Sequence, residues 1–278
     1  MFQIDSEIVR SVYETEPNYT IDYDDSCKEN ICVIYFSSNG IYFPNTEEIF
    51  RRRIVEKNTF EWYHTRIKAR KHIFVRDVFK QWYIEGINAE INTPKKMEEW
   101  LRKETDGCMV ITVGSSAGGY AAVLYGSLLK AAKVFAFDAQ FSLVPLAEKA
   151  TEEHDPLLLK YLHTDRARYF QLKPMLQPSV AYYYFLSVRS AFDIEQYNLL
   201  FAPPVPHESL CCIKFSTSCH GIPIVKDALR KVINMNDKQL SSFAVRNNCP
   251  FIFSLRVLGV KKMIANLVSK LKMRITKR

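Results

Sequence analysis

The glycine-rich segment at residues 114–119 (GSSAGG) constrains this chain more than any other part of it. It follows an apolar run at residues 108–113 (CMVITV) and precedes residues 120–129, which are rich in Ala and Leu. The first run predicts a buried strand and the second a buried helix, so the segment between them is a sharp strand-to-helix turn. The sequence therefore predicts an α/β fold in which this strand belongs to a mostly parallel central sheet.

Ser116 stands at the centre of a G-x-S-x-G pattern that it forms with Gly114 and Gly118. Small residues two positions before and after the serine let the backbone turn sharply and let the helix approach the strand. Such a turn raises the serine hydroxyl above the sheet and leaves the Ala117 N–H at a helix N-terminus, where it can face a developing oxyanion. The pattern indicates a serine nucleophile for acyl transfer; the alternative is a plain glycine-rich turn in a doubly wound fold.

Further apolar runs predict the rest of the sheet, and the loops after them carry polar residues. The predicted strands are residues 31–36, 72–75, 133–137, 180–188 and 210–215. A serine nucleophile needs a base with a pKa near 7 and a carboxylate that orients the base. His220, after the last strand, is the predicted base, and Asp193, after the strand before it, is the predicted acid. Asp138 and Asp227 are the alternative acids.

The small polar turn at residues 37–40 (SSNG) follows the strand at 31–36. In folds that present a serine on a G-x-S-x-G turn, a loop after a neighbouring strand supplies the second N–H of the oxyanion hole. Gly40 gives the turn at 37–40 the flexibility for this role. Asn39 or Ser38 is the predicted donor, and the alternative is an ordinary turn without a function.

The remaining segments are predicted to surround the sheet. Residues 1–30 predict edge strands, and residues 47–70 and 95–103 predict helices that cover it. The aromatic residues Phe79, Trp82 and Tyr83 fit helix core better than a surface on which a sugar would stack. The segment at about 144–178 predicts a small helical insertion over the site.

The net charge of +8 comes entirely from one end of the chain. Residues 256–278 hold eight basic residues and no acidic one, which leaves 30 basic and 30 acidic residues in the remainder. Apolar residues recur there at spacings of three and four, so the segment predicts a basic amphipathic helix after a catalytic unit at residues 1–255. Such a helix suits an anionic membrane surface, or it packs on its own domain with a solvated basic face.

Other features limit the compartment and the cofactors. The seven cysteines are odd in number and form no C-x-x-C pair, which favours a reducing cytoplasm. We expect no export signal, membrane span, metal site or nucleic-acid module. A single large domain suits the length of 278 residues.

The chain resembles the α/β-hydrolase superfamily over about residues 31–221 and, more narrowly, serine enzymes of bacterial capsule and cell-surface polysaccharide pathways. The narrower resemblance is carried by five segments: YFSSNG (35–40), RDxxxxWYxxG (76–86), GSSAGGYAAxLYG (114–126), DAQFSL (138–143) and SCHGIP (218–223). It implies an O-acetyltransferase with a Ser116–His220–Asp193 triad, acetyl-CoA as co-substrate and a capsular or cell-surface polysaccharide as acceptor.

Two other functions remain open at this point. One is a carboxylesterase or polysaccharide deacetylase that uses the same triad, and the other is a non-catalytic scaffold in polysaccharide assembly. Contact with the inner membrane or with capsule assembly proteins is expected from the basic C-terminal segment. Arg51, Arg52 and Arg53 are candidates to bind the CoA phosphates, against the alternative of a solvated helix face.

Overall fold

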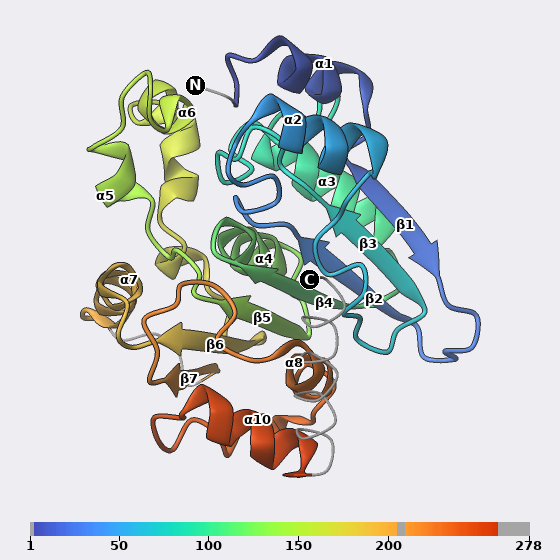
Figure 1. Cartoon of the computed structure of the whole chain (residues 1–278), viewed down its shortest axis with the longest axis vertical. Helices are drawn as coiled ribbons and strands as arrows, with labels where there is room; N and C mark the ends of the chain where they lie inside the picture. The colour runs from blue at the N-terminus through green and yellow to red at the C-terminus, as the bar shows by residue number, and fades with distance from the viewer. Residues whose placement is uncertain (1–2, 205–208, 261–278) are drawn as a thin grey trace, which may run out of the picture.

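The structure is a computed structural model that describes residues 3–204 and 209–260. Its centre is a seven-stranded sheet with the order β1-β3-β2-β4-β5-β6-β7 (Figure 1). All neighbouring strands are parallel except β1 and β3, so the carboxyl ends of β2 to β7 lie at one edge. The strands are β1 (Tyr19–Tyr23), β2 (Ile31–Phe36), β3 (Lys71–Val75), β4 (Met109–Ser115), β5 (Lys133–Phe137), β6 (Ala181–Ser187) and β7 (Leu210–Phe215). This confirms the predicted fold class and strands.

Side chains of each strand alternate between two apolar cores, one on each face of the sheet. In β2, Cys32, Ile34 and Phe36 belong to one core, and the residues between them belong to the other. The first face is covered by α1 (Glu7–Thr15), α3 (Pro94–Glu104) and α4 (Ala117–Leu128). The second is covered by α8 (Lys226–Val232), α9 (Asp237–Ser241) and α10 (Pro250–Leu258). Helices therefore cover both faces, as predicted.

The segment at 144–178 forms the predicted small helical insertion. It contains α5 (Val144–Ala147), α6 (Pro156–Tyr161) and two 3₁₀ turns, η2 (Asp165–Phe170) and η3 (Lys173–Met175). In Figure 1, α5 and α6 lie to the upper left of α4 and above α7 (Ala191–Phe201). A hydrogen bond from the Tyr120 hydroxyl to the Tyr169 carbonyl oxygen (2.7 Å) fastens it to α4.

Two of the predicted elements differ in the structure. Residues 7–15 form the helix α1, in which Val9, Val12 and Tyr13 are buried at helical spacing, so the prediction of edge strands holds only for β1. Residues 47–70 form only α2 (Glu47–Phe50) and the π-helix η1 (Arg51–Glu56). Asn58 and Trp62 then take positive φ angles of 44° and 69°, which end a helix and turn the chain back toward the loop after β2.

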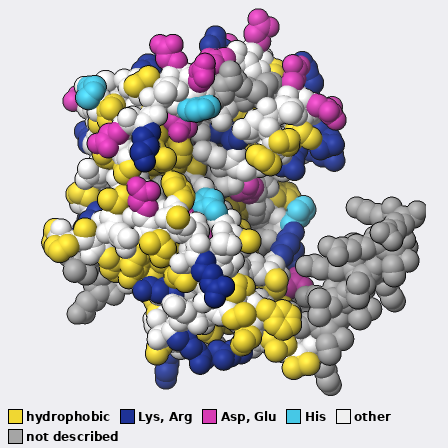
Figure 2. Space-filling view, turned by 60° about the vertical axis from the view of Figure 1, so that its left-hand side comes forward, with side chains coloured by type: hydrophobic (Ala, Val, Ile, Leu, Met, Phe, Trp, Pro, Cys, Tyr) yellow, Lys and Arg dark blue, Asp and Glu magenta, His cyan; other side chains and the backbone are white. Residues whose placement is uncertain are grey.

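The C-terminal part of the described chain presents an apolar surface. Phe251 and Ile252 of α10 are 56% and 47% exposed. Figure 2 shows hydrophobic and basic side chains next to each other at the end of the molecule where α10 lies. Most of the predicted basic helix, residues 261–278, lies outside the described residues. Among the helices described, none has the length and apolar character needed to cross a membrane.

Candidate active site

Ser116 sits in the turn between β4 and α4 in a strained backbone conformation. Its φ and ψ are 53° and −124°, a region that residues with a side chain rarely adopt. The Ser116 N–H donates to the Phe137 carbonyl oxygen (2.8 Å), which fixes the turn to the end of β5. A Cβ atom on Gly118 would lie 2.3 Å from the Phe36 carbonyl oxygen, so only glycine allows this close approach. The glycines of the pattern thus serve the predicted purpose.

The structure brings together the three residues predicted to form a triad. The His220 Nε2 atom lies 2.8 Å from the Ser116 Oγ atom. Its other ring nitrogen, Nδ1, lies 2.8 Å from the Asp193 Oδ1 atom. An Nδ1–H that donates to the carboxylate leaves Nε2 free to accept the serine proton, which is the arrangement a general base needs. The side chain of His220 is 38% exposed and that of Asp193 only 1%, so the base faces solvent and the acid does not.

Asp193 lies in the first turn of α7, where the helix dipole favours a negative charge. The Ser190 side chain caps this helix by accepting a hydrogen bond from the Asp193 N–H (3.4 Å). Of the alternative acids, Asp227 forms an ion pair with Arg230 (3.6 Å) on α8, whereas Asp138 lies beside the triad without a hydrogen bond to His220. The geometry thus selects Asp193 as the partner of the histidine.

Opposing effects act on the pKa of His220. Burial lowers it, while the hydrogen bond to Asp193 and the charges of Asp193 and Asp138 raise it, and the net direction is upward. The imidazole is therefore readily protonated once it takes the serine proton, and it needs a pH above its raised pKa to be free as a base.

Two backbone N–H groups of the predicted oxyanion hole have no acceptor among the described residues. Ala117 is the first residue of α4, so its N–H has no acceptor inside the helix. The Asn39 N–H makes no hydrogen bond to another described residue. The Ser38 N–H, by contrast, donates to the Glu61 Oε2 atom (2.7 Å) and is occupied. Of the two predicted donors in this loop, Asn39 is the one with a free N–H.

The sheet, the strained serine turn and the chain order serine, aspartate, histidine together decide the fold. This is the α/β-hydrolase fold. No protein-family model and no curated protein matches the sequence. The similar solved structures below have low sequence identity to this chain, and the likeness to the one with a TM-score of 0.50 bears on the fold alone.

Three of the similar structures illustrate this. A Staphylococcus aureus protein of unknown function is 11% identical, with 82% of this chain and 94% of that chain covered and a TM-score of 0.50. The capsule O-acetyltransferase of Neisseria meningitidis serogroup A is 11% identical, with coverages of 68% and 83% and a TM-score of 0.45. A fluorophosphonate-binding serine hydrolase of S. aureus is 12% identical, with coverages of 68% and 82% and a TM-score of 0.40.

Glu61 holds the loop that carries Asn39, a role that the sequence did not reveal. Besides the bond to the Ser38 N–H, its Oε1 atom accepts a hydrogen bond from the Ser38 Oγ atom (2.8 Å). Burial raises the pKa of Glu61, although both bonds to Ser38 act against this. No sequence signal marks Glu61, because it falls in a segment predicted as a helix with many charged residues.

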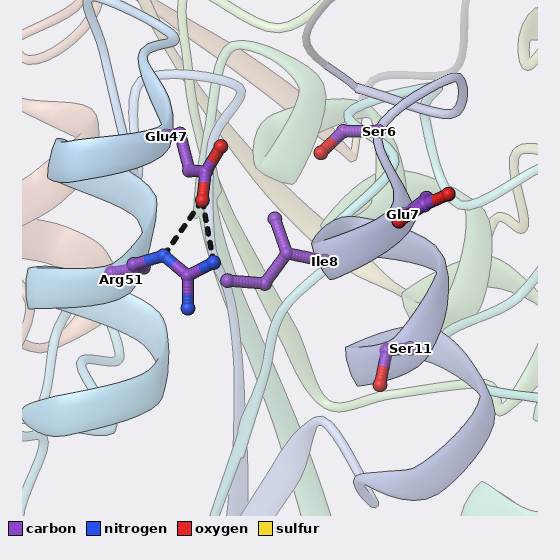
Figure 3. A pocket seen from close by; sticks show the side chains of 6 residues that line it. All are labelled: Ser6, Glu7, Ile8, Ser11, Glu47 and Arg51. Carbon is purple, nitrogen blue, oxygen red and sulfur yellow. Dashed lines mark hydrogen bonds and ion pairs between the residues drawn. The ribbon is translucent and has the colours of Figure 1, made fainter.

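The three predicted phosphate-binding arginines have different surroundings. The Arg51 Nε atom donates to the Glu47 Oε1 atom (2.7 Å) beside a pocket of about 530 Å³ between α1 and α2 (Figure 3). Glu7 also lines this pocket, so the two carboxylates of Glu7 and Glu47 make it unfavourable for a phosphate. The Arg53 Nη1 atom donates to the Ile41 carbonyl oxygen (2.9 Å), and Arg52 is exposed. Arg52 thus remains a predicted phosphate ligand with no partner described in the structure.

The aromatic residues after β3 are buried, and one of them bonds the loop that follows β2. Phe79, Trp82 and Tyr83 are no more than 9% exposed, in agreement with a core role, but they lie in turns and not in the predicted helix, with positive φ angles of 52° at Trp82 and 58° at Tyr83. The Tyr83 hydroxyl donates to the Ser37 carbonyl oxygen (2.7 Å), next to the oxyanion loop. The Asp77 carboxylate accepts four backbone N–H groups of this segment, and burial raises its pKa to about 6.

Proposed function

We propose that this protein is an O-acetyltransferase that moves acetyl from acetyl-CoA to a hydroxyl of a bacterial capsular or cell-surface polysaccharide. The observation that carries the proposal is the continuous hydrogen-bond series from the Ser116 hydroxyl through His220 to Asp193, with 2.8 Å at each step. This series prepares a serine for acyl transfer at neutral pH. The five sequence segments that resemble serine enzymes of capsule pathways support the choice of donor and acceptor.

In the first half-reaction, His220 takes the Ser116 proton while the serine oxygen attacks the thioester carbon. The negative charge on the carbonyl oxygen is stabilised by the N–H groups of Ala117 and Asn39, and each such donor is typically worth about 3 kcal/mol. The C–S bond then breaks, and protonated His220 gives its proton to the departing sulfur. The products of this half are CoA thiol and acetyl-Ser116.

In the second half-reaction, the acceptor replaces CoA at the site. His220, neutral again, takes the proton of a sugar hydroxyl, whose oxygen attacks the acetyl carbon. The same two N–H groups stabilise the second oxyanion, and protonated His220 returns the proton to Ser116. Atoms and charges balance over the cycle, since acetyl moves from sulfur to sugar oxygen and one proton moves to CoA.

A second candidate function is an esterase or polysaccharide deacetylase, in which water is the acceptor. The exposure of the His220 side chain, 38%, favours this alternative because solvent reaches the base directly. The triad serves both reactions equally, so the acceptor that reaches acetyl-Ser116 first decides between them.

Labelled acetyl-CoA distinguishes these functions. We expect label to move to a capsular polysaccharide with wild-type protein and not with Ser116→Ala, which should fold normally. Hydrolysis of p-nitrophenyl acetate that depends on Ser116, without transfer to any sugar, would replace the transferase by the esterase. Absence of Ser116-dependent turnover with either substrate would contradict both and leave the scaffold function.

We further propose that the protein works in the cytoplasm, in contact with the inner membrane or with capsule assembly proteins there. All seven cysteines are free, which suits a reducing compartment. The exposed apolar residues Phe251 and Ile252 of α10 lie just before the basic segment 261–278, and this combination suits an anionic membrane surface.

A further inference from the structure

Asp138 is a fully buried carboxyl group at the end of β5 that the mechanism above does not use. Its φ angle is 42°, so its backbone is strained like that of Ser116. Its Oδ1 atom accepts the Ser187 N–H (2.7 Å), and its Oδ2 atom accepts the Gly221 N–H (2.9 Å). The Oδ2 atom also lies 2.6 Å from the Ser187 Oγ atom.

A count of protons shows that this arrangement is incomplete if Asp138 is ionised. The Ser187 Oγ atom lies 2.6 Å from the Asp138 Oδ2 atom and 2.8 Å from the Cys219 carbonyl oxygen. A serine hydroxyl has one proton to donate, whereas an ionised carboxylate and a carbonyl oxygen only accept. One of the two short contacts would then have no proton. A proton on Asp138 completes the series from Asp138 Oδ2–H to Ser187 Oγ–H to the Cys219 carbonyl oxygen.

We propose that Asp138 is a positioning residue whose protonated form, together with Ser187, fixes the loop that bears His220. Cys219 and Gly221 are the two neighbours of His220 in the chain, and each is held by this pair. The loop is thereby fastened on both sides of the imidazole, which sets the direction of its Nε2 atom toward Ser116. The inference rests on the serine chemistry proposed above.

Burial and the neighbouring carboxylate of Asp193 also favour the neutral form of Asp138. A carboxylate oxygen of Asp138, a carboxylate oxygen of Asp193 and a ring nitrogen of His220 all lie within 4.8 Å of one another. The buried Oδ2 atom of Asp193 has no hydrogen-bond partner among the described residues. Tyr184 of β6 and Cys212 of β7 are the other titratable groups that face it. Burial and the charge of Asp193 raise the pKa of Asp138 to about 7, although the two hydrogen bonds from Ser187 and the charge of His220 act against this. Two neighbouring buried carboxylates repel each other when both are ionised, and of these two it is Asp193 that the imidazole contacts, at 2.8 Å.

The protonation state can be measured without any activity. Full-length protein labelled with ¹³C at the aspartate carboxyl carbons is titrated by NMR, and the Asp138 signal is assigned by its loss in Asp138→Asn. We expect this carboxyl group to titrate at about pH 7. Titration at the ordinary aspartate pKa of about 3.9 would overturn the proposal. Because this readout needs no substrate, it holds or fails independently of the transferase function.

The pH profile of Ser116-dependent p-nitrophenyl acetate hydrolysis tests whether Asp138 is charged, because such a charge changes the pKa of His220. Because Asp138 and His220 titrate in overlapping pH ranges, Asp138→Asn should move the acid limb of kcat/KM downward by less than a fully ionised Asp138 would require. An ionised Asp138 within 4.8 Å would instead give a downward shift of at least about 0.6 pH unit on substitution. That shift would contradict the proposal. We expect kcat itself to fall roughly tenfold, because the amide Nδ2 cannot accept the Gly221 N–H.

Ser187→Ala tests the positioning role. The change removes the link between Asp138 and the Cys219 carbonyl oxygen, so we expect kcat to fall roughly tenfold with KM nearly unchanged. Ser254→Ala is the matched control, because Ser254 is also fully buried and its hydroxyl also bonds a carbonyl oxygen, that of Pro250 (2.7 Å), far from the triad in the chain. Equal kcat values for the two variants would contradict the role of Ser187.

Discussion

Removal of the Glu61 carboxylate should disable one half of the oxyanion hole. In Glu61→Ala the Ser38 N–H and Oγ atoms both lose the acceptor that they contact at 2.7 and 2.8 Å, so the loop that carries Asn39 is no longer fixed. Loss of one oxyanion donor typically lowers kcat by about 10²–10³. We therefore expect kcat for p-nitrophenyl acetate to fall about 100-fold in Glu61→Ala, with the acid limb unchanged because the triad is intact.

Two further variants make this prediction sharp. In Glu61→Gln the amide oxygen can still accept a hydrogen bond from the Ser38 N–H, and the amide nitrogen can donate one to the Ser38 Oγ atom. We therefore expect kcat to fall by less than about tenfold. Glu56→Ala is the control, because Glu56 is an exposed acid of the same segment. Thermal unfolding shows whether each variant is folded. A folded Glu61→Ala protein with the kcat of wild type would refute the reasoning.

Three other changes have defined outcomes. Asp193→Asn should lower kcat by about 10⁴ and move the acid limb to lower pH, since the upward effect of Asp193 on the pKa of His220 is lost; an unmoved limb would count against the triad. Gly118→Ala should destabilise the protein, because its Cβ would lie 2.3 Å from the Phe36 carbonyl oxygen; a wild-type melting temperature would show that the turn is looser than described. Deletion of residues 261–278 should weaken sedimentation with anionic vesicles while ester hydrolysis persists, and unchanged sedimentation would exclude this segment as the anchor.

The sheet could be predicted because its strands are buried on both faces. Continuous apolar runs such as residues 31–36 and 133–137 have few other stable placements in a chain of this size. The serine turn was equally visible, since Gly114 and Gly118 leave no room for a Cβ atom. Chain order then placed the base and the acid at one edge of the sheet, which is where the structure has them.

Other parts of the site depend on contacts between segments far apart in the chain. The choice among acids is decided by the short helix α7, whose first turn presents Asp193 to His220. Asp138 follows β5 as expected, but only the structure shows its bond to Gly221 across 83 residues. Glu61 was missed because positive φ angles at Asn58 and Trp62 replace the predicted helix, and such angles leave little trace in composition.

Detection of the acyl-enzyme tests the central claim most directly. Wild-type protein is mixed with acetyl-CoA or p-nitrophenyl acetate, quenched in acid and digested, and the peptide that contains Ser116 is weighed by mass spectrometry. The account predicts one acetyl group on Ser116 that is absent in Ser116→Ala. Turnover with no acetyl group on Ser116 at any quench time, or with the group on another residue such as the exposed Cys219, would contradict it.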